Sequence, residues 1–216
     1  MTRDKYIRQL NDIKRMTLSM GEQAEELVNM SITSLIDQDV DLADQVISKD
    51  KDIDELYLDI EKKVIKIIAT QAPVASDLRL LLTVLKNSTD VERVGDFAED
   101  IAEITKELKD DKYITELIII PKMSEITLNM LRESLVAFDK EDVDLARKVH
   151  EQDDIVDTMF SRVFRAMTTF VMENPKNITQ ALRLLLVARH LERIADHAVN
   201  IANRTIYYME GKFKYI

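Results

Sequence analysis

The chain has 216 residues, with 3 Gly, 3 Pro, no Cys and a net charge of −10. Average usage of about 7% Gly and 5% Pro predicts roughly 15 and 11 of them, and this shortage argues against hairpins, sandwiches and glycine-rich phosphate loops. The missing cysteines exclude disulfides, thiolate metal sites and cysteine nucleophiles, and the negative charge, without a basic stripe, argues against nucleic acid as a partner.

Hydropathy indicates a folded chain without membrane insertion. Hydrophobic residues make up 46% of the sequence and charged residues 32%. The longest purely aliphatic runs are four or five residues, far below the roughly 18 that a membrane-spanning helix needs. Residues 1–10 contain four charged side chains and no apolar signal core. We therefore expect a cytoplasmic protein, and contact with the inner face of the membrane through partner proteins stays open.

Apolar residues at spacings of three and four predict long amphipathic helices throughout the chain. In chain order, the expected helices cover residues 2–36, 40–69, 74–108, 122–138, 141–172 and 177–209. Pro73 lies between the second and third helices, whereas Pro121 and Pro175 lie at the starts of later ones. These are the positions that suit a residue without a backbone N–H.

The second half of the chain repeats the first. Residues 39–43, Asp-Val-Asp-Leu-Ala, recur without a gap at 142–146, and a Glu-Arg-x-x-Asp segment at 92–96 recurs at 192–196. Such a repeat predicts one structural unit in two copies, and helices with short connections pack antiparallel. We expect an all-α fold of six long helices in two tandem, pseudo-twofold-related three-helix bundles, at residues 1–113 and 114–216. A long helix pair running through both halves stays open as an alternative.

Four pairs of carboxylates at i, i+4 spacing occupy matching places in the two halves. Like charges at this spacing destabilise a helix by a few tenths of a kcal/mol, so their recurrence suggests a ligand. Carboxylates suit Mg, Mn and Ca, and also iron or zinc in oxygen-rich sites. If the second and third helices of each bundle lie side by side, each half gathers four ligands, and the candidates are Asp50, Asp54, Glu92 and Asp96, with Asp153, Asp157, Glu192 and Asp196.

Two simpler interpretations of these acids compete with metal binding. Arg93 and Arg193 could neutralise the pairs as plain salt bridges. The acids could also form a solvated helix face, because the first-half stripe continues through Glu99, Asp100, Glu103 and Glu107. Their second-half equivalents are Val199, Asn200, Asn203 and Tyr207, so there the acidic pair persists without its neighbours.

Beyond the acidic pairs, the sequence offers few residues for metal binding or catalysis. His197 adjoins Asp196 and is a further candidate ligand. A ferritin-like di-iron site needs Glu-x-x-His on two helices, and this tetrapeptide does not occur. Neither a Ser-His-Asp arrangement nor a phosphate loop can be assembled. Gly95 lies inside the repeated Glu-Arg-x-x-Asp turn, where the missing side chain would let helices approach closely.

These segments together resemble the PhoU family of phosphate-uptake regulators. Residues 71–79, QAPVASDLR, with DVERVGD at 90–96, resemble its first-half signature, and LERIADHAVNIA at 191–202 resembles its second-half signature. The resemblance covers nearly the whole chain. Ala195 stands where the family usually has glycine, a change that a helix tolerates well.

The resemblance implies a non-enzymatic regulator made of two three-helix bundles. PhoU proteins act between a phosphate ABC transporter, with its ATPase, and a sensor histidine kinase, and with phosphate plentiful they restrain uptake and keep the starvation response off. Some members carry multinuclear iron or zinc clusters on Glu/Asp-x-x-x-Asp motifs, which correspond here to the four acidic pairs, with Asp100 joining the first-half set. We expect the second centre to be poorer in charge. Members also tend to form dimers, so a homodimer is expected.

Three functions are therefore to be compared. The first is a metal-binding adaptor that regulates phosphate uptake. The second is a carboxylate-bridged metal-binding protein or metalloenzyme, against which the missing histidine ligands weigh. The third is a purely structural helical scaffold, in which the acids are only solvated.

Overall fold

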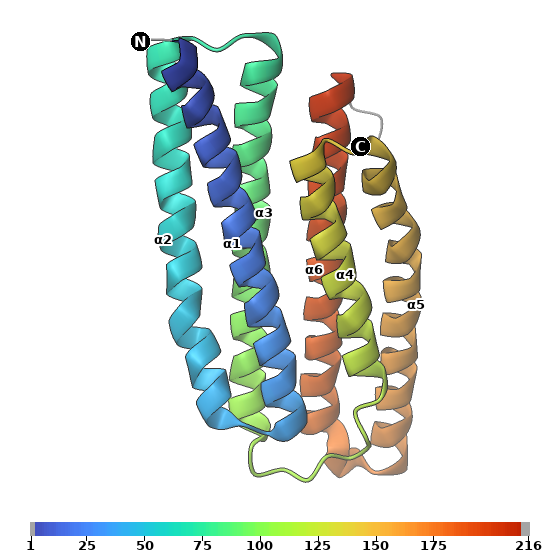
Figure 1. Cartoon of the computed structure of the whole chain (residues 1–216). Coiled ribbons are helices and arrows are strands. Elements are labelled where there is room, and N and C mark those ends of the chain that lie inside the picture. Colours follow the sequence, from blue (N-terminus) through green and yellow to red (C-terminus); the bar gives the residue numbers. More distant parts are fainter. Residues whose placement is uncertain (1–2, 213–216) are drawn as a thin grey trace.

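A computed structural model describes residues 3–212 of the chain. Six helices follow one another, and a short 3-10 helix, η1 (Pro175–Asn177), precedes the last of them (Figure 1). Their bounds are α1 (Arg3–Asp37), α2 (Val40–Gln71), α3 (Ala75–Leu108), α4 (Ile119–Lys140), α5 (Val143–Glu173) and α6 (Ile178–Glu210). No strand occurs in the described range, so the predicted all-α fold is confirmed.

The helix ends agree with the sequence-based expectation to within three residues. The largest difference is at α4, which begins at Ile119, so that Pro121 lies inside the first turn and does not begin the helix. The first turn tolerates proline because its N–H groups have no partner within the helix. The expected start of the first helix at Thr2 lies outside the described residues.

The repeated Asp-Val-Asp-Leu-Ala segment begins the second helix of each half. The side chain of Asp39 accepts a hydrogen bond from the backbone N–H of Leu42, and Asp142 accepts one from Leu145, both at 2.9 Å. These aspartates satisfy N–H groups that the first helical turn leaves free, which stabilises a helix start by roughly 1 kcal/mol. This part of the repeated acid pattern is therefore explained by helix capping.

Each set of three helices packs into its own bundle, and no described helix runs through both halves (Figure 1). The apolar stripes predicted for the first and third helices are buried in the structure: Leu10, Ile13, Met20, Ala24 and Leu27 on α1, with Val84, Val91, Val94, Ala98, Ile101 and Leu108 on α3. In the described part of the chain, no helix has an apolar stretch long enough to cross a bilayer.

The two bundles differ at their first helix, since α1 has 35 residues and α4 only 22. The segment 109–118 follows α3 and takes the place of the missing turns. The Tyr113 hydroxyl donates to the carbonyl of Leu35, and the backbone N–H of Ile114 donates to Oε1 of Gln180. These contacts tie the connection between the halves to both bundles.

The bundles meet chiefly through α3 and α6, which run antiparallel. Nε of Arg79 donates to the carbonyl of Tyr208 near one end of this interface, and Arg183 pairs with Glu107 near the other. Phe97 lies at the centre, with its ring centroid 5.5 Å from that of His190 and 5.8 Å from that of His197. Helices α1 and α4 form a second contact between the bundles.

Candidate metal centre

In the first half, α2 and α3 bring three of the predicted carboxylates together. One ligand oxygen from each of Asp50, Asp54 and Asp96 lies within 4.8 Å of the others. Asp50 and Asp54 follow one another by one turn on α2, and Asp96 faces them from α3. The side-by-side packing of the second and third helices thus produces the proximity that the spacing predicted.

Asp50 is the unusual member of this group. It is only 5% exposed, and its Oδ1 atom has no hydrogen-bond partner among the described residues. A buried polar atom without a partner costs roughly 1–3 kcal/mol, and more if it is charged. A buried carboxylate with an unpartnered oxygen, grouped with two further carboxylates, is what a cation-binding site requires before the cation is present.

Gly95 on α3 explains how Asp50 can be buried so deeply. A Cβ atom placed on Gly95 would lie 2.5 Å from Oδ1 of Asp50 and 3.2 Å from Cδ1 of Ile53. The carboxylate therefore lies against the bare backbone of α3. The close approach of α2 and α3 that was expected at Gly95 is present, and it makes room for the Asp50 carboxylate as well as for helix packing.

The carboxylates also change one another's protonation. Burial, followed by the charges of Asp54 and Glu99, raises the pKa of Asp50 to about 7. Burial and the neighbouring Asp96 raise the pKa of Glu92, and burial and Glu103 raise that of Glu99. A bound cation would favour the charged forms and lower these pKa values.

The salt-bridge interpretation holds for part of this group. Nη1 of Arg93 lies 2.8 Å from Oδ2 of Asp96, and its Nε lies 3.6 Å from Oε2 of Glu92. Arg93 therefore offsets charge on α3. It does not account for Asp50, whose buried oxygen keeps no partner.

The second half repeats the arrangement in a looser form. Burial and the charges of Asp157 and Asp196 raise the pKa of Asp153 to about 6. Asp153 is half-buried, whereas Asp50 is buried, and Ala195 occupies the second-half position equivalent to Gly95. Within residues 3–212, only the first half brings three acidic ligand atoms within 4.8 Å of one another.

Arginines also form ion pairs with two of the second-half acids. Arg189 pairs with Glu192 through Nη1, and Nη1 of Arg193 lies 3.6 Å from Oδ2 of Asp196. Arginine pairs with two carboxylates in each half, so the halves differ instead in the close group of Asp50, Asp54 and Asp96 and in Glu99, whose second-half equivalent is Val199. A hard cation would find the better donor set between α2 and α3.

Two predicted ligands have partners elsewhere, and one neighbour was missed. Oδ2 of Asp100 lies 3.6 Å from Nδ1 of His190, and Nδ1 of His197 lies 2.7 Å from Oδ1 of Asp90, both across the interface between the halves. Glu99, interpreted from sequence as part of a solvated stripe, instead interacts with Asp50. Its position three residues after Asp96, and seven after Glu92, could have placed it on the face that meets α2.

The donor set fits a multivalent cation. Carboxylate oxygens from Asp50, Asp54 and Asp96 are hard ligands, and Glu92 and Glu99 lie close enough to affect the titration of Asp50. Such a site can hold iron, zinc, Mg or Mn. It joins two helices of one bundle, so the cation would affect the packing of α2 on α3.

Replacing Gly95 with alanine is expected to weaken metal binding in the first half by about tenfold, an effect typical of disturbing the surroundings of a ligand. The new Cβ would displace the Asp50 carboxylate. The free energy of unfolding should fall by about 1 kcal/mol or more, because crowding of Asp50 and Ile53 outweighs the preference of a helix for alanine over glycine. Titration with zinc and thermal unfolding in chelator measure the two effects separately.

The matched control is Ala195→Gly, which makes the reverse change in the second half. It should lower stability by up to about 1 kcal/mol and leave the first-half affinity unchanged. Equal zinc affinity in Gly95→Ala and in the unaltered protein would contradict the role given to Gly95.

Comparison with known proteins places the chain in a family. A family model described as the PhoU domain matches twice, over residues 17–105 and 120–205. A phosphate-specific transport system accessory protein PhoU homolog from Aquifex aeolicus is 40% identical over 208 residues, covering 96% of this chain and 94% of that protein. The PhoU of Escherichia coli K12 is 32% identical over 204 residues, covering 94% of this chain and 85% of that protein.

Solved structures agree with the sequence matches. The crystal structure of PhoU from Pseudomonas aeruginosa superposes with a TM-score of 0.92 at 34% identity, covering 96% of this chain and 100% of that one. The PhoU structure from Streptococcus pneumoniae gives a TM-score of 0.90 at 26% identity, covering 98% of this chain. With two copies of the domain, the same fold and relatives above 30% identity along almost its whole length, the chain belongs to the PhoU family.

Proposed function

We propose that this chain is a cytoplasmic negative regulator of phosphate uptake and of phosphate-starvation signalling. The observation that carries the proposal is the PhoU domain in both halves, together with relatives named as accessory proteins of a phosphate-specific transport system. The proposed mode of action is binding to other proteins. We propose no catalytic role for it.

Its proposed partners are the ATPase of a phosphate ABC transporter and a sensor histidine kinase. An adaptor that contacts both can report transporter activity to the kinase, and the chain would work as a homodimer at the inner face of the membrane. Two similar bundles in one chain support binding to two partners, because each bundle offers its own helical surface (Figure 1).

A metal ion or small metal cluster completes the proposal. Asp50, Asp54 and Asp96 would hold it, with Glu92 and Glu99 beside them. When bound, the metal supplies positive charge to the buried carboxylates. Iron or zinc is proposed, and Mg or Mn would suit the same oxygen ligands. The buried, unpartnered oxygen of Asp50 supports this assignment.

Deleting the gene in a strain without a second PhoU homologue tests the regulatory role. Phosphate-starvation genes should be expressed in rich phosphate, and phosphate uptake should rise. Reintroducing the intact chain should restore repression. Normal repression in the deletion strain would contradict the proposed function.

A further inference from the structure

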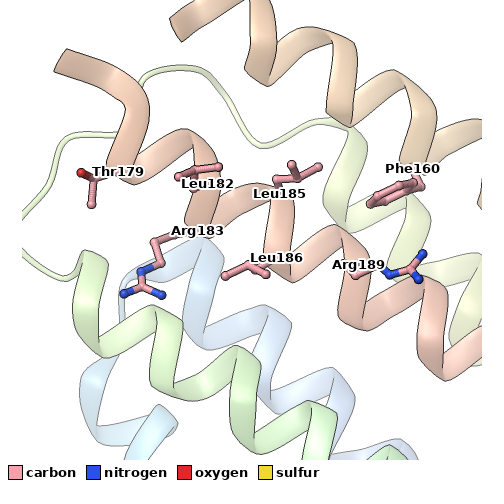
Figure 2. Close-up of a pocket in the computed structure, with 7 residues that line it drawn as sticks. All are labelled: Phe160, Thr179, Leu182, Arg183, Leu185, Leu186 and Arg189. Atoms are coloured by element: carbon pink, nitrogen blue, oxygen red, sulfur yellow. The ribbon is translucent and has the colours of Figure 1, made fainter. Parts of the chain in front are cut away.

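A second feature of the chain is an apolar groove on the outer face of α6. It has a volume of about 500 Å³ and is lined by Phe160 of α5 and by Leu182, Leu185 and Leu186 of α6 (Figure 2). Leu182 is 53% exposed and Leu186 is 41% exposed. Large apolar side chains grouped on a surface are a mark of a protein contact.

Two arginines from α6 also line the groove (Figure 2). Arg183 pairs with Glu107 through Nε, and Arg189 pairs with Glu192 through Nη1, so each keeps further guanidinium nitrogens for another partner. Their side chains are 39% and 41% exposed. The guanidinium of Arg189 also lies 5.7 Å from the ring centroid of Phe160.

The first half carries only part of this surface. At a constant offset of 100 residues, Leu182 and Leu185 correspond to Leu82 and Leu85, whereas Leu186 corresponds to Lys86, Arg183 to Thr83 and Arg189 to Thr89. Two of the three leucines are therefore shared by the two halves, whereas the third leucine and both arginines occur only in the second half. The complete leucine stripe flanked by arginines therefore occurs in the second half and not at the matching positions of the first half.

We propose that this groove binds an amphipathic helix of a partner protein, with acidic residues beside its apolar side chains. Leu182, Leu185 and Leu186 follow one another at the spacing of one helix face, and such a stripe is complementary to the apolar face of a second helix. Carboxylates on the flanks of the incoming helix would meet Arg183 and Arg189. Grooves from two copies of this chain facing each other would bring arginines against arginines.

The proposal rests on the adaptor role proposed above, because an adaptor needs a surface for a partner protein. Binding to the groove can nevertheless be tested independently of that role. The chain has no cysteine, so Thr179→Cys at the edge of the groove accepts a single environment-sensitive fluorophore. The probe is a synthetic amphipathic peptide of about 18 residues, or five helical turns, with a leucine stripe flanked by glutamates. A second peptide carries lysine at every glutamate position.

The acidic peptide should give a saturable fluorescence change, and the basic peptide should bind at least about tenfold more weakly. Leu186→Lys restores the first-half residue at an exposed position and should weaken binding by about tenfold or more. Leu82→Lys makes a similar change at an exposed position in the first half and should leave binding unchanged. Circular dichroism verifies that both variants are folded.

Three results would overturn the proposal: no saturable response, equal responses to the two peptides, or equal losses in Leu186→Lys and Leu82→Lys. Sedimentation equilibrium of the intact chain adds a fourth, since self-association abolished by Leu186→Lys would assign the groove to a second copy. Peptide binding with normal repression in the deletion strain would remove only the proposed function. Derepression without peptide binding would remove only the groove assignment.

Discussion

Asp50→Asn is expected to lower the zinc or iron affinity of the first half by at least about a hundredfold, since even an outer-shell partner of a ligand is worth 10–100-fold. Asp50 is the buried member of the carboxylate group, and its amide analogue keeps the shape of the side chain without its charge. Protein purified without chelator should contain fewer metal equivalents by elemental analysis. Titration of chelator-treated protein gives the affinity directly.

Asp100→Asn is the matched control for this experiment. Asp100 lies on the same helix as Asp96 but near His190, so its loss should leave the first-half affinity almost unchanged. Asp153→Asn should remove only second-half metal. Equal metal content in Asp50→Asn and the unaltered chain, after growth with ample iron and zinc, would contradict the proposed centre.

The same residue predicts how the stability of the metal-free protein depends on pH. The pKa of Asp50 is raised to about 7, so the folded chain holds this proton more tightly than the unfolded chain does. The resulting stabilisation is complete below the unfolded pKa of about 4 and is lost as the pH rises through 7. Since one pKa unit corresponds to about 1.4 kcal/mol, the free energy of unfolding should fall by up to about 4 kcal/mol from this group.

Urea unfolding in chelator at a series of pH values measures this dependence. Asp50→Asn should flatten the profile between pH 4 and 8, and adding metal to the unaltered chain should raise its stability most at the upper end, where the carboxylates are already ionised. Asp153, with its pKa raised to about 6, keeps a smaller dependence in both proteins. Identical profiles for Asp50→Asn and the unaltered chain would show that Asp50 titrates normally.

Much of the fold follows from the sequence because local rules decide it. Helix spans depend on apolar spacing and on prolines, and the duplication is visible in segments such as 39–43 and 142–146. The pairing of Asp50 with Asp54 needs only the pitch of one helix. Bringing Asp96 to them needs only that neighbouring helices pack side by side, which short connections impose.

What the sequence could not predict depends on distances between helices that no local pattern encodes. Asp90 contacts His197 and Arg204 across the interface between the halves, and nothing in their sequence spacing indicates it. The burial of Asp50 could not be predicted from the sequence either, since it depends on the bare backbone of Gly95 in another helix. Both features require the relative placement of whole helices before any one side chain can be positioned.

Arg204→Ile is expected to destabilise the chain by about 3–5 kcal/mol, the cost of removing one partner of a buried ion pair. Arg204 contacts Oδ2 of Asp90 through Nη1 and donates from the same atom to the carbonyl of Lys86 at 2.9 Å. Burial lowers the pKa of Arg204 to about 10, although the group stays charged at neutral pH. Without it, the buried carboxylate of Asp90 would keep only His197 as a partner for its charge. Urea unfolding at pH 7 measures the loss.

The loss of stability in Arg204→Ile should come from leaving the Asp90 carboxylate buried without its partner, rather than from the lost attraction between the two groups. A second substitution separates these two causes. Asp90→Asn removes the charge and keeps an oxygen for His197, so the Arg204→Ile, Asp90→Asn double variant should regain most of the lost stability. Isoleucine is already the first-half equivalent at this position, as Ile104, so its shape suits the helix. If the double variant is as unstable as Arg204→Ile alone, the loss comes from packing or from the bond to Lys86, and the ion pair is not what joins the two halves.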